Sequence, residues 1–204
     1  MDEPQASYLP DPPSDNAVEA AYEEDRSDKG YVWNVTRLWS WRPDIAESFA
    51  EIRTNLMQSS TLGDRDFAVL VASTAGALGD SYCSLAWGEK LAKLSDPDTA
   101  AAVVTGRDAD TLSEREAALA AWARQVVRDP NGTRPEDVDA LRRAGLDDRE
   151  IFEATVFVGF RLGFSSINDA LGTAPDRQLA DGVPDAVREA VAYGRRPSAA
   201  PSPV

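Results

Sequence analysis

The sequence predicts an all-α protein, and three observations support this. Apolar residues recur with the 3.6-residue period of a helix through most of residues 44–171. Helix-start signals, in which Ser, Thr or Asp is followed three residues later by Glu, precede several of these stretches. No convincing strand pattern interrupts them. The run from Phe67 to Ala72 would fit a buried strand in isolation, but the helical spacing around it outweighs that interpretation.

Three helices are predicted in the first half of the chain. The first follows Pro43 and Asp44, a typical helix start, and its apolar residues stand at offsets 0, 4, 7 and 11. The second begins near Asp64 and is ended by Gly79, and the third covers about residues 81–94. The apolar faces of the first two contain Ile45, Phe49, Ile52, Leu56, Phe67, Leu70, Val71, Thr74 and Leu78.

Three more helices are predicted after a loop rich in Asp and Thr. They begin after Ser113, near Pro135 and after Asp147, each with a Glu at capping-box spacing, and the second of them ends at Gly145. In the last, residues 151–171, apolar side chains occupy nearly every face. This pattern indicates a helix that is buried on most sides or lies at a subunit contact.

The folded domain is predicted over residues 31–193, between two flexible terminal segments. Residues 1–30, the leader, hold nine acids against two bases together with four prolines. Such a composition buries too little apolar surface to offset the entropy lost on ordering. Residues 194–204 form a proline-rich tail of similar character.

Charge and hydropathy exclude several functional classes. With 35 acidic and 21 basic residues the net charge is −14, so binding to nucleic acid is disfavoured. No apolar run is long enough for a membrane span, and the N-terminus lacks the basic start and apolar run of a secretory signal. One cysteine can form no intrachain disulfide, which agrees with the predicted cytoplasmic location.

The candidate site is centred on Cys83, the only cysteine of a chain that has no histidine. It lies near the predicted helix start at Ser81, where the positive end of the helix dipole favours the reactive thiolate. Asp80 is expected to cap this helix and to accept the Cys83 backbone N–H. The alternative is that Cys83 is only a small buried apolar residue.

Five short segments, in this order and spacing, resemble a known family: Leu78–Gly88, Leu112–Glu116, Arg128–Pro130, Asp137–Gly145 with Asp148–Ile151, and Asp169–Gly172. Over residues 33–175 the chain resembles the alkylhydroperoxidase D and carboxymuconolactone decarboxylase-like proteins, in particular their peroxidase-related branch. The resemblance implies an alkylhydroperoxidase D-like helical bundle, a homo-oligomer and chemistry without a cofactor.

The resemblance also implies a mechanism based on two cysteines. In the family, the second cysteine of a Cys-x-x-Cys pair attacks the peroxide and the first resolves the sulfenic acid, while a histidine and a glutamate move protons. Cys83 matches the second cysteine, but Asp80 and Trp87 replace the first cysteine and the histidine. Asp66 is the nearest counterpart of the glutamate. Oxidised Cys83 would therefore need an external thiol, and the indole of Trp87 cannot accept a proton.

The resulting prediction is a thiol peroxidase or oxidoreductase of low or altered activity that acts on a peroxide or organic small molecule. Cys83 is the expected nucleophile, Asp80 or Asp66 the proton acceptor, and Tyr82 and Trp87 the candidate binding residues. Two alternatives remain: a redox-inactive binding or scaffolding subunit, and a cofactor-free acid/base enzyme of the decarboxylase kind. No metal site is expected, because the carboxylates show no ligand spacing and no histidine accompanies them.

Overall fold

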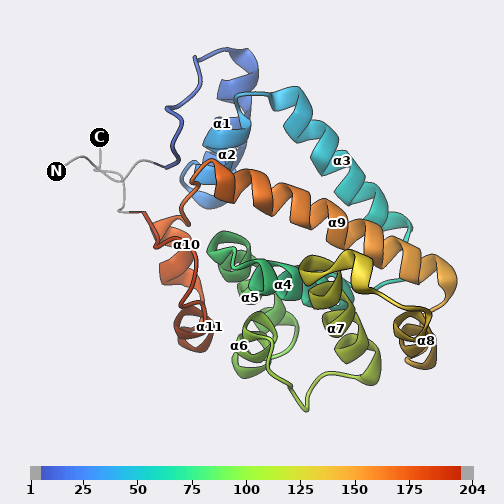
Figure 1. Ribbon diagram of the computed structural model, residues 1–204. Coiled ribbons are helices and arrows are strands. Elements are labelled where there is room, and N and C mark those ends of the chain that lie inside the picture. Colours follow the sequence, from blue (N-terminus) through green and yellow to red (C-terminus); the bar gives the residue numbers. More distant parts are fainter. Residues whose placement is uncertain (1–5, 199–204) are drawn as a thin grey trace.

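The computed structural model describes residues 6–198, whose regular secondary structure is entirely helical (Figure 1). The prediction of an all-α protein is therefore confirmed. None of the described helices is long and apolar enough to cross a membrane. The α-helices are α1 (Asn16–Lys29), α2 (Asn34–Trp39), α3 (Pro43–Ser59), α4 (Asp64–Leu78), α5 (Ser81–Leu94), α6 (Pro97–Thr105), α7 (Glu114–Arg128), α8 (Pro135–Arg143), α9 (Asp148–Ala170), α10 (Arg177–Gly182) and α11 (Asp185–Ala190).

Helix α4 lies at the centre of the molecule. Residues 67–75 are all buried, and the helix packs against α5, α6, α7 and α9. The rings of Phe67 and Phe157, from α4 and α9, lie 4.7 Å apart between centroids. Because neighbours cover α4 on every side, its sequence is apolar all round. This explains why residues 67–72 could pass for a buried strand when considered alone.

The helices predicted from capping signals begin where expected. Ser113 and Asp147 each form a capping box, with Glu116 and Glu150 at the third helical position. The helix α6 was not predicted, because its residues fall in the segment rich in Asp and Thr. The six-residue helices α2, α10 and α11 were also missed. A helix of one or two turns shows little periodicity and depends on tertiary packing.

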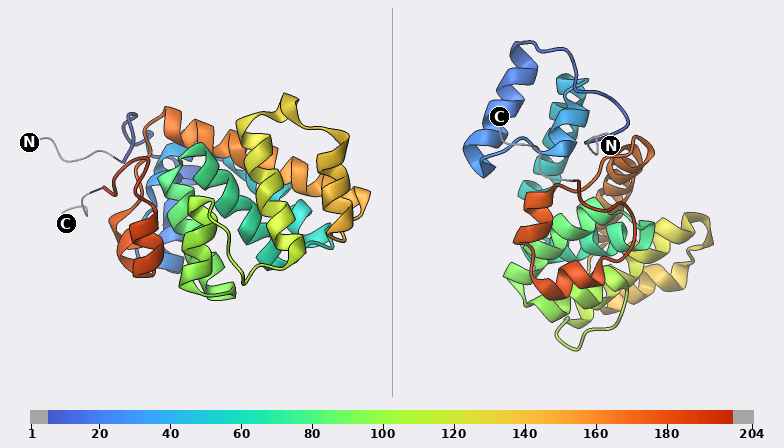
Figure 2. Two further views of the ribbon diagram at one scale, coloured as in Figure 1. Left: turned by 60° about the horizontal axis from the view of Figure 1, so that its bottom comes forward. Right: turned by 90° about the vertical axis from the view of Figure 1, so that its left-hand side faces the viewer.

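The predicted leader contains a helix: residues 6–30, its described part, include α1 and lie against the domain, while flexibility of the leader stays a prediction. Asp15 caps α1 by accepting two backbone N–H groups, and α1 buries Val18 and Tyr22 beside α2 and α3 (Figure 2). The Tyr8 N–H donates to the carbonyl of Leu171. Apolar residues between the acidic ones provide the contacts of this segment.

The start of the predicted tail is also held on the domain. The Ser198 N–H donates to the carbonyl of Pro175 at 2.8 Å, and the Asn34 side chain donates to the Ser198 hydroxyl at 3.0 Å. Residues 1–5 and 199–204 lie outside the described residues, so the expectation of flexibility remains a prediction there.

A charged cluster joins the starts of α4, α7 and α9. Arg115 donates to Glu150 at 2.7 Å and lies 3.4 Å from a carboxylate oxygen of Asp66. Thr61 donates a further hydrogen bond to Glu150 at 2.6 Å. The hydrogen bond from Arg115 is the main cause that lowers the pKa of Glu150 to about 2. The hydrogen bonds from Thr61 and from the Asp147 backbone contribute less, and partial burial acts in the opposite direction.

Glu150→Gln is expected to make the protein less stable at neutral pH and less sensitive to acid. A carboxyl group with a lowered folded-state pKa contributes stability above its unfolded pKa, and this is lost as the pH falls through the folded value. The loss should amount to about 3 kcal/mol between pH 5 and pH 2. Urea unfolding of both proteins across this range measures it. Equal losses in the two proteins would contradict the assignment.

Candidate functional site

The turn between α4 and α5 positions the only thiol. Gly79 ends α4 in the left-handed conformation, with φ of 86°, which costs glycine little because it has no Cβ. Asp80 then caps α5, and its Oδ1 accepts the Cys83 backbone N–H at 3.0 Å. The expected cap is therefore present, and Cys83 lies in the first turn of α5.

The environment of the Cys83 sulfur does not favour the thiolate. Only 2% of the residue is exposed. Burial raises the pKa of the thiol to about 12, and the charge of Asp80 acts in the same direction. Arg161, whose Nη2 lies 3.1 Å from Sγ, and Ser165 oppose this only in part. At neutral pH the group is a protonated thiol, so the helix dipole does not produce the expected thiolate.

Asp66 is not near Cys83. It occupies the third position of α4, accepts the Gly63 N–H at 3.1 Å and pairs with Arg115. Asp80 follows the other end of the same helix, so about 20 Å of helix separates the two carboxylates. The structure therefore does not bring together the two expected proton acceptors. Only Asp80 is beside the thiol.

The two candidate binding residues have other contacts. Tyr82 is buried, and its hydroxyl donates to the carboxylate of Asp176. Trp87 lies one turn after Cys83 and packs beneath Arg161, whose guanidinium carbon is 5.5 Å from the centroid of the indole. Trp87 is half-buried and supports Arg161.

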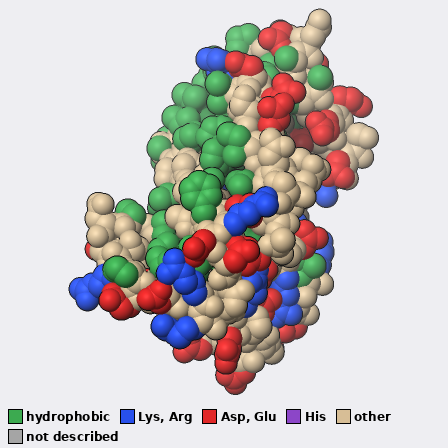
Figure 3. Space-filling model, turned by 90° about the vertical axis from the view of Figure 1, so that its right-hand side faces the viewer, with side chains coloured by type: hydrophobic (Ala, Val, Ile, Leu, Met, Phe, Trp, Pro, Cys, Tyr) green, Lys and Arg blue, Asp and Glu red, His purple; other side chains and the backbone are tan. Residues whose placement is uncertain are grey.

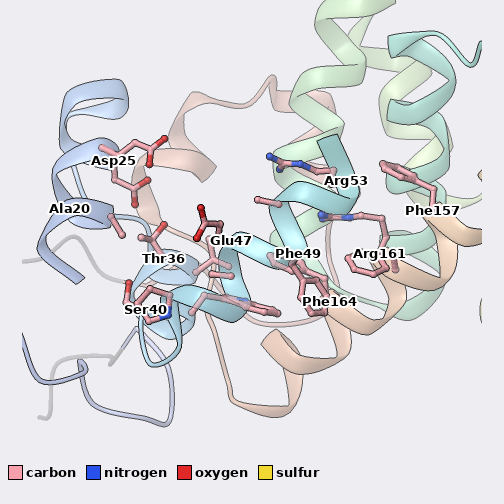
Figure 4. Close-up of a pocket in the computed structure, with 18 residues that line it drawn as sticks. Ala20, Asp25, Thr36, Ser40, Glu47, Phe49, Arg53, Phe157, Arg161 and Phe164 are labelled. Atoms are coloured by element: carbon pink, nitrogen blue, oxygen red, sulfur yellow. The ribbon is translucent and has the colours of Figure 1, made fainter. Parts of the chain in front are cut away.

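A cavity of about 620 Å³ lies between α1, α2, α3 and α9 (Figure 4). None of the five site residues predicted from the sequence lines it. Aromatic rings form much of its wall: Phe164 stacks on Trp39 at 4.9 Å, and Phe49 lies 4.6 Å from Phe160. Arg53 and Arg161 also line the cavity, as do Glu24, Asp25 and Glu47.

Arg161 connects the cavity with the thiol. It lines the cavity, donates to Cys83 Sγ, and is 7% exposed. Sequence analysis missed it, although it is the only charged residue between Glu153 and Asp169 in an otherwise apolar helix. A single charged residue in an apolar stretch could have indicated a functional residue, because a buried charge rarely lacks a function or a partner. Arg53 had no comparable signal.

The described residues contain no group of three or more acidic or cysteine side chains that could hold a metal ion. Cys83, Asp80 and Arg161 are gathered at the thiol, and Arg161 also lines the cavity.

The comparisons show relatives in structure but not in sequence. No protein-family model matches the chain, and no curated protein matches it. An uncharacterised peroxidase-related protein from Ralstonia eutropha, described as an alkylhydroperoxidase AhpD core, superposes with a TM-score of 0.76 at 23% identity, over 85% of this chain and 94% of its own. A peroxidase-related protein from Silicibacter sp. gives 0.78 at 20% identity, over 88% and 96% of the two chains.

A third similar structure has a different described activity. The debrominase Bmp8 superposes with a TM-score of 0.71 at 16% identity, over 91% of this chain and 97% of its own. A cysteine-to-alanine variant of Bmp8 in complex with 2,3,4-tribromopyrrole gives 0.65 at 16% identity, over 86% and 90% of the chains. At these identities the similarity establishes the architecture. The chain has the alkylhydroperoxidase D fold, as the resemblance in its sequence implied.

Proposed function

We propose that the protein is a thiol oxidoreductase of low resting reactivity, in which Cys83 acts on a peroxide or small organic molecule bound in the cavity. The observation that carries this proposal is the position of Arg161, which lines the cavity and lies 3.1 Å from the sulfur. The shared fold with peroxidase-related proteins and with a debrominase supports thiol chemistry at this place. Arg161 lies between Sγ and the cavity, so its side chain has to shift before a substrate in the cavity can reach the sulfur.

With a hydroperoxide, the Cys83 thiolate attacks one peroxide oxygen. An S–O bond forms as the O–O bond breaks, and the departing alkoxide takes up a proton, which yields a sulfenic acid and an alcohol. Asp80, whose Oδ1 accepts the Cys83 backbone N–H, is the carboxylate beside the thiol and the candidate proton acceptor. One external thiol then condenses with the sulfenic acid and releases water, and a second thiol regenerates Cys83 as the disulfide of the reductant leaves.

Treatment with an alkyl hydroperoxide and a dimedone-type trap tests this function. We expect mass spectrometry to find the trap on Cys83, formed slowly, and thiol-dependent peroxide consumption that is lost in Cys83→Ser. If no sulfenic acid forms and the variant consumes peroxide as fast as the wild type, the protein is not a thiol oxidoreductase.

One alternative has its own structural support. The occluded sulfur and the raised pKa of Cys83 favour a family member that binds a small molecule without redox chemistry. The same experiment distinguishes the two functions. An acid/base enzyme has less support, because neither Asp66 nor Asp80 lines the cavity.

We also propose that a second copy of the chain covers the outer face of α3 and α9. Helix α3 buries none of its residues within the chain, although its sequence is amphipathic. On this side, Figure 3 shows a band of hydrophobic side chains. The exposed fractions reach 68% for Phe152, 42% for Trp41, 40% for Ile52 and 39% for Ile45. A contiguous apolar patch is typical of a protein–protein contact.

Phe152→Glu is expected to weaken this association. The side chain is exposed in the single chain, so a carboxylate there should leave the fold intact and place a charge in the contact. Light scattering should show a multiple of 22 kDa for the wild type and 22 kDa for the variant. Leu94→Glu, at an exposed apolar residue of α5, is the matched control and should keep the wild-type mass. A monomeric wild type would refute the assembly.

A further inference from the structure

We propose that the cavity binds a planar aromatic monocarboxylate, with the carboxylate held between Arg53 and Arg161 and the ring among the aromatic side chains. This inference rests on the proposed function for the role of the cavity as the substrate site. It adds the chemical class of the ligand, which nothing in the fold specifies.

The first observation is that the two arginines lack acidic partners. Neither Arg53 nor Arg161 forms an ion pair with any carboxylate of residues 6–198. Arg161 is 93% buried, and its Nε has no hydrogen-bond partner. A buried, unpaired guanidinium is costly, so an anion that pairs with it gains affinity. Both arginines line the same cavity, and burial, followed by the charge of Arg161, lowers the pKa of Arg53.

The second observation is the aromatic wall beside these cations. The Arg161 guanidinium carbon lies 4.7 Å from the centroid of Phe164, and the Phe164 ring stacks on Trp39 with an interplanar angle of 14°. Phe49 and Phe160 continue the wall along α3 and α9. A flat ring can stack on such side chains while its carboxylate reaches the guanidinium groups, which bind carboxylates through parallel hydrogen bonds.

The third observation limits the charge of the ligand. Figure 4 shows Asp25 on the side of the cavity away from Arg161, with Glu47 between Asp25 and the two arginines, and Glu24 also lines the cavity. A second carboxylate placed at that acidic side would be repelled. The cavity therefore favours a ligand whose negative charge lies at one end of an otherwise apolar ring system.

Titration calorimetry with 2-naphthoate tests the proposal, using the full chain. We expect 2-naphthoate to bind at least tenfold more tightly than the neutral 2-naphthamide and than 2,6-naphthalenedicarboxylate. Arg53→Met, at an exposed residue, should weaken 2-naphthoate binding about tenfold and leave the affinity for the amide unchanged. Arg143→Met, an exposed arginine of α8, is the matched control and should bind 2-naphthoate like the wild type.

Equal affinity for the acid and the amide, or equal effects of the two arginine substitutions, would overturn the proposal. Cys83→Ser separates it from the proposed function, because this variant should lose peroxide chemistry and still bind 2-naphthoate. Binding without any sulfenic acid in the wild type would refute the oxidoreductase and support the ligand class. Sulfenic acid formation without naphthoate binding would refute the ligand class alone.

Discussion

Alkylation of native Cys83 by iodoacetamide at pH 7 is expected to run about a thousandfold more slowly than alkylation of an unperturbed cysteine. Only the thiolate reacts, and burial together with Asp80 raises the pKa from 9.0 to about 12. The rate should also rise about tenfold for each pH unit and reach no plateau below pH 10, because the thiolate population grows in that proportion up to the pKa. Labelling reactions that are quenched at set times and analysed by mass spectrometry measure both the rate at pH 7 and its dependence on pH.

Two controls belong to this experiment. The protein unfolded in urea should react at the ordinary rate, since the burial is then lost. Asp80→Asn removes the negative charge beside the sulfur and keeps an oxygen that can cap α5, so its Cys83 should react faster than the wild type. A native wild type that labels as fast as the unfolded chain would show that the thiol is not held as the structure indicates.

Gly76→Ala is expected to destabilise the protein by about 3 kcal/mol or more. Gly76 lies where α4 meets α6, and a Cβ there would be 2.1 Å from the carbonyl oxygen of Val104. The obstacle is backbone, so the two helices would have to separate. The higher helix propensity of alanine should by itself stabilise the variant by about 1 kcal/mol. This contribution is smaller than the cost of the clash. Urea unfolding monitored by circular dichroism measures the difference.

Gly182→Ala is the matched control for this prediction. Gly182 is the last residue of α10, and no atom lies within 4 Å of the position that its Cβ would take. The free energy of unfolding should change by about 0.5 kcal/mol or less. If Gly76→Ala is as stable as Gly182→Ala, α4 and α6 do not approach as closely as described.

The longer helices could be predicted because their signals are local. Ser113 with Glu116 and Asp147 with Glu150 satisfy backbone groups within one turn, so three or four residues are enough to mark a helix start. Gly79 ends α4 for a reason that is equally local. The packing of the leader could not be predicted, because it depends on tertiary contacts: Val18 and Tyr22 of α1 are buried beside α2 and α3, and the Tyr8 N–H donates to the carbonyl of Leu171.

The same division applies to the site. The sequence by itself determined the fold class, the single thiol, the absence of histidine and the Asp80 cap on α5, since these depend on composition or on residues within one turn of each other. Only the tertiary structure decided that the sulfur is occluded, that Asp66 lies at the far end of α4, and that Arg161 stands between Cys83 and an aromatic cavity. The pKa of a thiol and the walls of a cavity depend on side chains from separate helices, and the distances between those helices are set by packing.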